Sequence, residues 1–396
     1  MVNTKHDTGG YDRSCYQREI FNGNSLYNAF IKSRRGCGWK PQVQQFEMNL
    51  LPELAKMRRE LAGGAYQLSP TTSFILHERG KTRQITGESI RDRVAKHALC
   101  DGLLSPAIKK YLIYDNGASQ PGKGVDFARR RLLAHLRRYY AGRGSNEGYV
   151  LLMDFSKYYD NIRHDILLGL FRKYVDDPAA LDLLEKALAA SRVDVSYLTE
   201  EEYSGCLETV FDALKHSQVD KALLTGKKWM PKHLNIGDQV AQVAGICYPM
   251  EIDNYIKIVK AVKFYGRYMD DSYIIHESRE YLQRLLEEIT QIARGLGIFI
   301  NARKTRICRL GQYWRFLQVQ YSLTESGRVI QKINPKRLTA LRRKMKKLAR
   351  LLPGQEFANW YGSWFRSNYK IMSRRQRANL DALFHQLKEG QKTCGK

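Results

Sequence analysis

Three aspartates stand where the sequence predicts that strands end. Asp154 directly follows the apolar run Tyr149–Met153, and the adjacent acids Asp270 and Asp271 join two further predicted strands. A carboxylate at the end of a buried strand costs free energy unless a partner compensates it, and two adjacent carboxylates repel each other unless a cation lies between them. If these strands are neighbours in one sheet, the three carboxylates meet at the same edge.

Such a group of carboxylates is suited to hold divalent cations. Mg²⁺ prefers hard oxygen ligands, and two such ions about 4 Å apart can activate a hydroxyl nucleophile and stabilise a departing pyrophosphate. The sequence therefore predicts two Mg²⁺ ions, with Mn²⁺ able to substitute, and nucleotidyl transfer as the chemistry. Taken alone, Asp270 and Asp271 are explained equally well by an ordinary polar hairpin turn, so the prediction also depends on Asp154.

The hydrophobic pattern places these acids in a chain that mixes helices and strands. Apolar residues at three- and four-residue spacing predict helices, and short apolar or β-branched runs predict strands. The predicted strands are 74–76, 82–85, 149–153, 262–269 and 272–275. The predicted helical segments are 17–62, 94–104, 125–140, about 165–233, 235–258, 281–296 and about 335–352.

The charge of the chain indicates an anionic partner. Among 396 residues, 66 Lys and Arg stand against 40 Asp and Glu, a net charge of +26. Between residues 303 and 350, fifteen residues are Lys or Arg and only Glu325 is acidic, and Trp314, Trp360 and other aromatic residues lie in or near this run. Positive charge combined with flat rings suits a nucleic-acid backbone with exposed bases. We favour this partner over a solvated basic face or an anionic membrane surface.

The basic helix predicted at about 335–352 carries most of this surface. Its apolar stripe predicts an inward face, and the opposite face is expected to bind nucleic-acid phosphates. That face consists of Arg342, Arg343, Lys346, Lys347 and Arg350. An RNA-binding module without catalysis would explain this charge but not the three aspartates.

Composition also predicts where the protein works. No apolar run approaches the roughly 18–20 residues of a membrane span, and the first residues lack the apolar stretch of a signal peptide. The seven cysteines are scattered and form no C-x-x-C pair, as expected in a reducing compartment. We therefore expect a cytoplasmic protein with no membrane partner.

The order of the motifs resembles that of the reverse transcriptases. The palm motifs of this family, D-x-x-x-x-[F/Y] and Y-x-D-D, match Asp154–Tyr159 and Tyr268–Asp271. Other elements follow in the family's order and cover roughly residues 60–320. They are Lys81–Ile85, Asp92–Leu99, Gly122–Gly124, Leu296–Thr305 and Phe316–Leu317. The resemblance implies an α+β fold of the right-hand polymerase type, with fingers, a palm of antiparallel sheet backed by helices, and a helical thumb.

The resemblance also implies domain boundaries and metal ligands. Residues 1–148 are expected to form N-terminal helices and fingers, 149–320 the palm with a helical insertion at about 165–233, and 321–396 the basic thumb. Asp154 and Asp270 are expected to bind both metal ions, with Asp271 beside them. The backbone carbonyl of Phe155 is expected to complete the shell of one ion.

Further residues are expected to contact the incoming dNTP. Lys81 and Arg83 match the family's basic finger strand and are expected to reach the triphosphate, where cations neutralise developing charge. Tyr159 occupies the family's gate position, where a ring excludes a 2′-hydroxyl. Lys304 matches the motif lysine near the leaving group, and it is expected either to protonate pyrophosphate or simply to bind the backbone.

One segment is similar to a particular subfamily. Ile236, Gly237 and Gln242 match the I-G-x-x-x-S-Q element of diversity-generating retroelement reverse transcriptases, with Ala241 in place of Ser. These enzymes copy a structured template RNA into cDNA with errors at adenines. The alternative is a reverse transcriptase of a phage-defence or retron-like system that makes cDNA from an associated non-coding RNA. Either reading leaves room for a small accessory protein subunit.

We predict that the wild-type protein misincorporates opposite template adenine more than opposite other bases. Family members with Gln at the position of Ile236 can make a hydrogen bond near the nascent pair, and its loss is worth roughly 0.5–1.5 kcal/mol, or up to about tenfold in discrimination. Ile236→Gln should therefore raise fidelity at adenine. Deep sequencing of cDNA copied from one defined RNA measures this, and equal wild-type error rates at all four bases would refute it.

Overall fold

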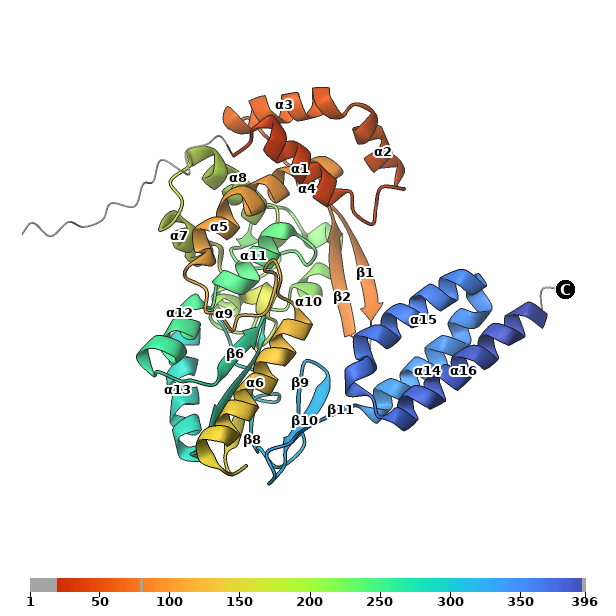
Figure 1. The fold of residues 1–396 in the computed structure, drawn as a ribbon. Coiled ribbons are helices and arrows are strands. Elements are labelled where there is room, and N and C mark those ends of the chain that lie inside the picture. Colours follow the sequence, from red (N-terminus) through yellow and green to blue (C-terminus); the bar gives the residue numbers. More distant parts are fainter. Residues whose placement is uncertain (1–19, 79–80, 394–396) are drawn as a thin grey trace, which may run out of the picture. The chain divides into compact units, whose positions relative to one another are not determined.

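Figure 1 shows the computed structural model, which describes residues 20–78 and 81–393. The chain forms two compact units that are interleaved in sequence. Unit 1 consists of Met1–Pro121, Phe155–Ala261 and Leu286–Asn301, and unit 2 of Gly122–Asp154, Val262–Leu285 and Ala302–Lys396. Helices and small antiparallel sheets occur together, which confirms the predicted α+β class. The predicted division into three consecutive domains stays a prediction.

The first part of unit 1 is helical, as predicted. α4 is buried on most of its surface and packs against α1, and it continues as a π-helical turn, Cys100–Leu104. Ser89 caps α4 by accepting the Asp92 N–H at 3.1 Å, a common way to satisfy the first turn. The helices are α1 (Gly23–Ser33), α2 (Pro41–Met48), α3 (Leu50–Ala62), α4 (Ile90–Leu99) and α5 (Ser105–Lys109).

A two-stranded hairpin projects from these helices in unit 1. β1 (Thr72–Glu78) and β2 (Lys81–Gly87) pair antiparallel, with Leu76 opposite Arg83. Both predicted strands are therefore confirmed. The sequence predicts a turn over residues 78–81, of which 79–80 lie outside the described residues.

The segment predicted as a mostly helical insertion is only partly helical. Its helices are α7 (His164–Arg172), α8 (Pro178–Ala189), α9 (Glu200–Glu208) and α10 (Ala213–Ser217). Between them, β4 (Val193–Asp194) pairs with β5 (Trp229–Met230), strands too short for periodicity to indicate. These strands lie beside a small separate core, which consists of Val195, Leu198, Phe211, Ala213 and Met230.

The prediction of a single helix from 235 to 258 is wrong, because the structure divides this segment into shorter helices. α11 (Gln239–Cys247) begins after Asp238, whose side chain accepts the Val240 N–H at 2.8 Å. Pro249 then interrupts the helix because proline has no N–H to donate. The chain resumes as α12 (Met250–Asn254) and a π-helical turn, Tyr255–Val259.

Unit 2 is built around a four-stranded antiparallel sheet in the order β6-β7-β3-β8. The central β3 is buried, as its apolar sequence predicts. α6 (Val125–Arg143) packs on the sheet, where His135 Nδ1 lies 3.0 Å from the Tyr273 hydroxyl. The strands are β3 (Tyr149–Met153), β6 (Tyr265–Tyr268), β7 (Asp271–His276) and β8 (Arg306–Arg309), and α13 (Arg279–Gly295) follows β7.

A second sheet and three C-terminal helices complete unit 2. β10 (Val319–Leu323) pairs with both β9 (Trp314–Phe316) and β11 (Val329–Ile333). The helices, blue in Figure 1, share one core with both sheets and α6. They are α14 (Pro335–Leu351), α15 (Gly354–Asn368) and α16 (Arg374–Thr393). None of the helices in the described part of the chain is long and apolar enough to cross a membrane.

His164, the first residue of α7, is a buried histidine whose imidazole is neutral. Its Nε2 donates to the His233 carbonyl at 2.7 Å, while buried Nδ1 has no hydrogen-bond partner among the described residues. Burial lowers its pKa to about 4. The folded protein therefore resists protonation at this site.

We predict that His164 destabilises the fold in acid. Because the folded pKa is about 4 and the ordinary value is 6.5, the unfolded chain binds the proton first as pH falls. The stabilising contribution is complete above the ordinary pKa and is lost as pH falls through the folded pKa, by up to about 3 kcal/mol. Denaturant unfolding across this range should show His164→Gln losing less stability than wild type. His385→Gln, at an exposed position of α16, is the control; equal losses in all three proteins would contradict the prediction.

Candidate active site

Two of the three predicted carboxylates lie at one edge of the central sheet. β3 and β7 run antiparallel with Met153 opposite Ser272, so Asp154 and Asp271, one residue further along, fall at the same edge. Asp154 is only 7% exposed and Asp271 is half-buried. Both line one cavity of about 300 Å³. The register of the sheet therefore brings together acids that are distant in sequence.

The third carboxylate lies in a tight turn. Tyr268 pairs with Asp271, so Met269 and Asp270 form a two-residue loop between β6 and β7. Met269 has a φ of 55°, a left-handed conformation that residues other than glycine adopt rarely. The buried Arg267 donates from Nη1 to the Met269 carbonyl at 3.0 Å. The expectation that both acids form the turn is wrong, since Asp271 is already the first residue of β7.

Lys304 places a positive charge against the buried aspartate. Its Nζ donates to both carboxylate oxygens of Asp154, at 2.8 and 2.7 Å. The position follows from β8, which begins two residues later and pairs with β3, Arg306 opposite Leu152. The ammonium compensates the free-energy cost of burying the Asp154 carboxylate. Lys304 therefore provides the partner that the sequence predicts for this buried acid.

Three arginines line the same cavity. Arg303 precedes β8, Arg306 begins it, and Arg315 lies on β9. Together with Lys304 they set four cations against two carboxylates, an excess that suits a phosphate group. The sequence places all three in its basic run between residues 303 and 350 but does not distinguish them from the other cations there. Only the strand pairing brings them to the same cavity as the acids.

The donor set at this edge suits a divalent cation in part. The oxygens of Asp154 and Asp271 are hard ligands, and the Lys304 ammonium already shows that a cation is stabilised against Asp154. Asp270 does not line the cavity. Within residues 20–78 and 81–393, no group of three or more His, Cys, Asp or Glu side chains is arranged to hold a metal ion. The arrangement therefore offers two carboxylates, with the third in the adjoining turn.

Most residues expected to contact a nucleotide belong to unit 1, whereas Lys304 belongs to unit 2. The Leu234 N–H donates to the Tyr159 carbonyl at 2.9 Å, which fixes the start of the Ile236 segment beside the predicted gate residue. Thr86 Oγ1, in β2, donates to Asn235 Oδ1 at 3.0 Å. The finger strand, the gate residue and the Ile236 segment are therefore adjacent, as a nucleotide pocket would require.

These residues differ in how far they face solvent. Arg83, Tyr159 and Ile236 are half-buried, whereas Gly237 and Gln242 are exposed. Gly237 has a φ of 111°, which a residue with a side chain would adopt only with strain. The side chain of Lys81 lies outside the described residues.

Phe155 and the basic helix complete the predicted set. Phe155 is 3% exposed, and its backbone bridges to Ile300 within unit 1. α14 buries its apolar stripe as predicted, including Leu338, Leu341 and Met345. On its predicted nucleic-acid face, Arg342 is half-buried and the exposed residues are Arg343, Lys346, Lys347 and Arg350.

A buried ion network that sequence analysis missed supports the Ile236 segment. Lys96 of α4 donates to Asp238 Oδ2 at 2.7 Å and also contacts Glu88, and all three side chains are at most 7% exposed. Burial lowers the pKa of Lys96, but the charges of Asp238 and Glu88 raise it more, so the pKa lies above its ordinary value. Because Asp238 also caps α11, this lysine holds the helix that follows Ile236 and Gly237.

Comparison with known proteins adds one distant relative. The chain is similar to Protein YkfC of Escherichia coli (strain K12), with 23% identity over 286 residues that cover 68% of this chain and 71% of YkfC. No family model matches the chain. The similarity spans most of both proteins.

We predict that Lys96→Met lowers the free energy of unfolding by about 3–5 kcal/mol, because it leaves two buried carboxylates without their cation. Urea denaturation measures the loss. Lys32→Met, which breaks the exposed pair with Asp101, is the matched control and should cost at most about 1 kcal/mol. Adding Glu88→Gln and Asp238→Asn to Lys96→Met should recover part of the stability. If Lys96→Met costs no more than the control, the network has no structural role.

Proposed function

We propose that this protein is an RNA-directed DNA polymerase of the reverse transcriptase type. The observation that carries the proposal is the placement of Asp154 and Asp271 at adjoining ends of the paired strands β3 and β7, around one cavity, with Lys304 against Asp154. The motif order supports it, as does the gathering of Tyr159 and the Ile236 segment in unit 1. In this proposal the sheet of unit 2 is the palm, the β1–β2 hairpin belongs to the fingers, and α14–α16 form the thumb.

The chemistry assigned to each residue follows from its charge and position. Asp154 and Asp271 would hold Mg²⁺, with Asp270 and the Phe155 carbonyl as the further ligands that the resemblance implies. When bound, the metal supplies Lewis acidity at the reacting phosphate. Arg303, Arg306 and Arg315 line the cavity and would neutralise phosphate charge. Lys304 carries a proton within reach of the same space and would donate it to the departing pyrophosphate.

The partners in this proposal are dNTPs, a structured template RNA and the cDNA product. The net charge of +26 and the exposed cations of α14 support an RNA partner. A retroelement role, with errors at adenine, rests on Ile236, which offers only dispersion contacts to the nascent pair. Faithful or repetitive cDNA copurifying with the protein would favour the phage-defence role instead. A cytoplasmic location is part of the same proposal.

We predict that Asp270→Ala combined with Asp271→Ala lowers dNTP incorporation by more than about a thousandfold, because metal-bound charge stabilisation supplies several kcal/mol. RNA binding should survive, since the cations proposed to bind the RNA backbone lie on α14. Primer extension with Mg²⁺ or Mn²⁺ and a filter-binding assay measure the two properties. Chelation of the metal should have the same effect on wild type.

The control is Glu287→Ala, which removes an exposed carboxylate of α13. It should leave synthesis within about twofold of wild type, since surface substitutions away from a site have small effects. Continued synthesis by the double aspartate variant would exclude this site as the catalytic centre.

A further inference from the structure

A second cavity in unit 2 shares no lining residue with the carboxylate cavity. It has a volume of about 380 Å³ and lies between the start of α6, the first turn of α14 and the end of α15. Four of its lining residues are cations, Lys123, Arg129, Arg130 and Arg337, and the single acid is Asp126. None of these residues has a role in the site described above.

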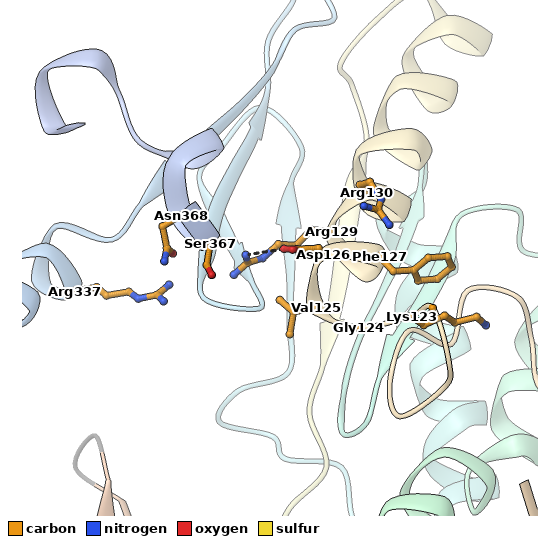
Figure 2. A pocket seen from close by; sticks show the side chains of 11 residues that line it. Lys123, Gly124, Val125, Asp126, Phe127, Arg129, Arg130, Arg337, Ser367 and Asn368 are labelled. Carbon is orange, nitrogen blue, oxygen red and sulfur yellow. Dashed lines mark ion pairs between the residues drawn. The ribbon is translucent and has the colours of Figure 1, made fainter. Parts of the chain in front are cut away.

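Two of the cations face each other across the cavity. Figure 2 shows Arg129 from α6 and Arg337 from α14 reaching in from opposite walls, with Ser367 and Asn368 beside them. In the same view Lys123 and Arg130 point away from this pair. Two guanidinium groups directed at one space repel each other unless an anion lies between them.

The existing partners of Arg129 leave part of its charge uncompensated. Its Nη2 donates to the Leu317 carbonyl at 2.8 Å, and its Nη1 lies 3.7 Å from Asp126. Asp126 is 77% exposed, so this pair is largely screened by water. The buried Nε of Arg129 has no hydrogen-bond partner among the described residues. A buried donor of this kind costs free energy until an acceptor reaches it.

The remaining walls offer further donors of suitable type. Gly122 and Gly124, in the loop that enters α6, add no side chain to the cavity wall, and no side chain caps the first turn of this helix. Ser367 donates its hydroxyl to the Ser363 carbonyl at 2.9 Å, whereas Asn368, 4% exposed, donates one amide hydrogen to the Trp364 carbonyl at 2.8 Å and keeps a second one for a ligand. Guanidinium forks bind phosphate with two parallel hydrogen bonds, which makes phosphate a better match than a single-point anion.

We propose that this cavity binds a backbone phosphate of a nucleic-acid strand, with Arg129 and Arg337 as its principal donors. A strand fits better than a free phosphate because α14 continues from Arg337 with exposed cations that further phosphates of the same strand can meet. They are Lys344 and Lys347, which are seven and ten residues after Arg337 and therefore lie on the same side of the helix. The inference rests on the proposed function in taking the ligand to be RNA or its cDNA.

The test is equilibrium binding of a uniform single-stranded RNA over a series of salt concentrations, in EDTA so that no synthesis occurs. Arg337→Gln should weaken binding about tenfold at low salt and reduce the slope of log K against log salt by about 0.7–0.9, the value of one phosphate contact. Asp126→Asn removes the only acid of the cavity and should strengthen binding. The control is Arg375→Gln, at an exposed position of α16, which removes one positive charge outside the cavity. It should change the RNA affinity and the salt slope less than Arg337→Gln does.

Equal behaviour of Arg337→Gln and Arg375→Gln at every salt concentration would overturn the site. If circular dichroism shows that Arg337→Gln is unfolded, the Asp126→Asn variant tests the proposal instead. An RNA affinity of Asp126→Asn no higher than that of wild type would also contradict the site. Inorganic phosphate should not displace RNA from wild type when its concentration equals that of the RNA phosphates. Displacement at that concentration would show that the cavity binds free phosphate and would contradict the proposal of a nucleic-acid strand. Because EDTA prevents synthesis, the binding experiment tests this site independently of the proposed polymerase activity. A negative binding result would not contradict the polymerase activity, and a lack of synthesis would not contradict the phosphate site.

Discussion

The antiparallel pairing of β3 with β7 determines where the acids of the candidate active site lie. A strand's side chains alternate between faces, so a shift of one residue would turn Asp154 toward the opposite face from Asp271. Burial of β3 in the middle of the sheet opposes such a shift, because Val150 and Leu151 would exchange environments. The cavity, the Lys304 contact and the approach of the arginines on β8 and β9 all depend on this register.

Compensated burial of charge is the second constraint on the molecule. Asp154 has Lys304, and Lys96 has both Asp238 and Glu88. Each pair joins elements that are far apart in sequence, so the electrostatic requirement also fixes tertiary contacts. A neutral residue at either lysine would leave buried carboxylates that the protein interior disfavours.

The sequence predicted the elements whose signal is local. The run Tyr149–Met153 is apolar throughout, and the structure forms β3 with these bounds. The apolar face of α14 was equally predictable, since Leu338, Leu341 and Met345 recur at helical spacing and are buried in the structure. Pro249 is also a local signal, because a proline inside a helical pattern ends or kinks the helix. The prediction of a single helix over residues 235–258 did not take this proline into account.

What the sequence did not predict depends on contacts between distant segments. Nothing near Lys96 indicates that it meets Asp238, and nothing near Arg315 indicates that it lines the same cavity as Asp154. The two-residue strands β4 and β5 form because they pair with each other, not because of their own composition. The acids were found because they follow strands, whereas their spacing around a metal ion is a tertiary property.

The interleaving of the two units bears on how the protein folds during synthesis. The chain passes from one unit to the other five times, after residues 121, 154, 261, 285 and 301, and α13 belongs to both. Unit 1 is therefore incomplete until residue 301 has left the ribosome, although its first helices emerge early. The central strand β3 must wait for β7 and β8 before its second edge is covered. Folding here is governed by long-range contacts, which makes it slow, and the nascent chain exposes apolar strand surface for longer than consecutive domains would.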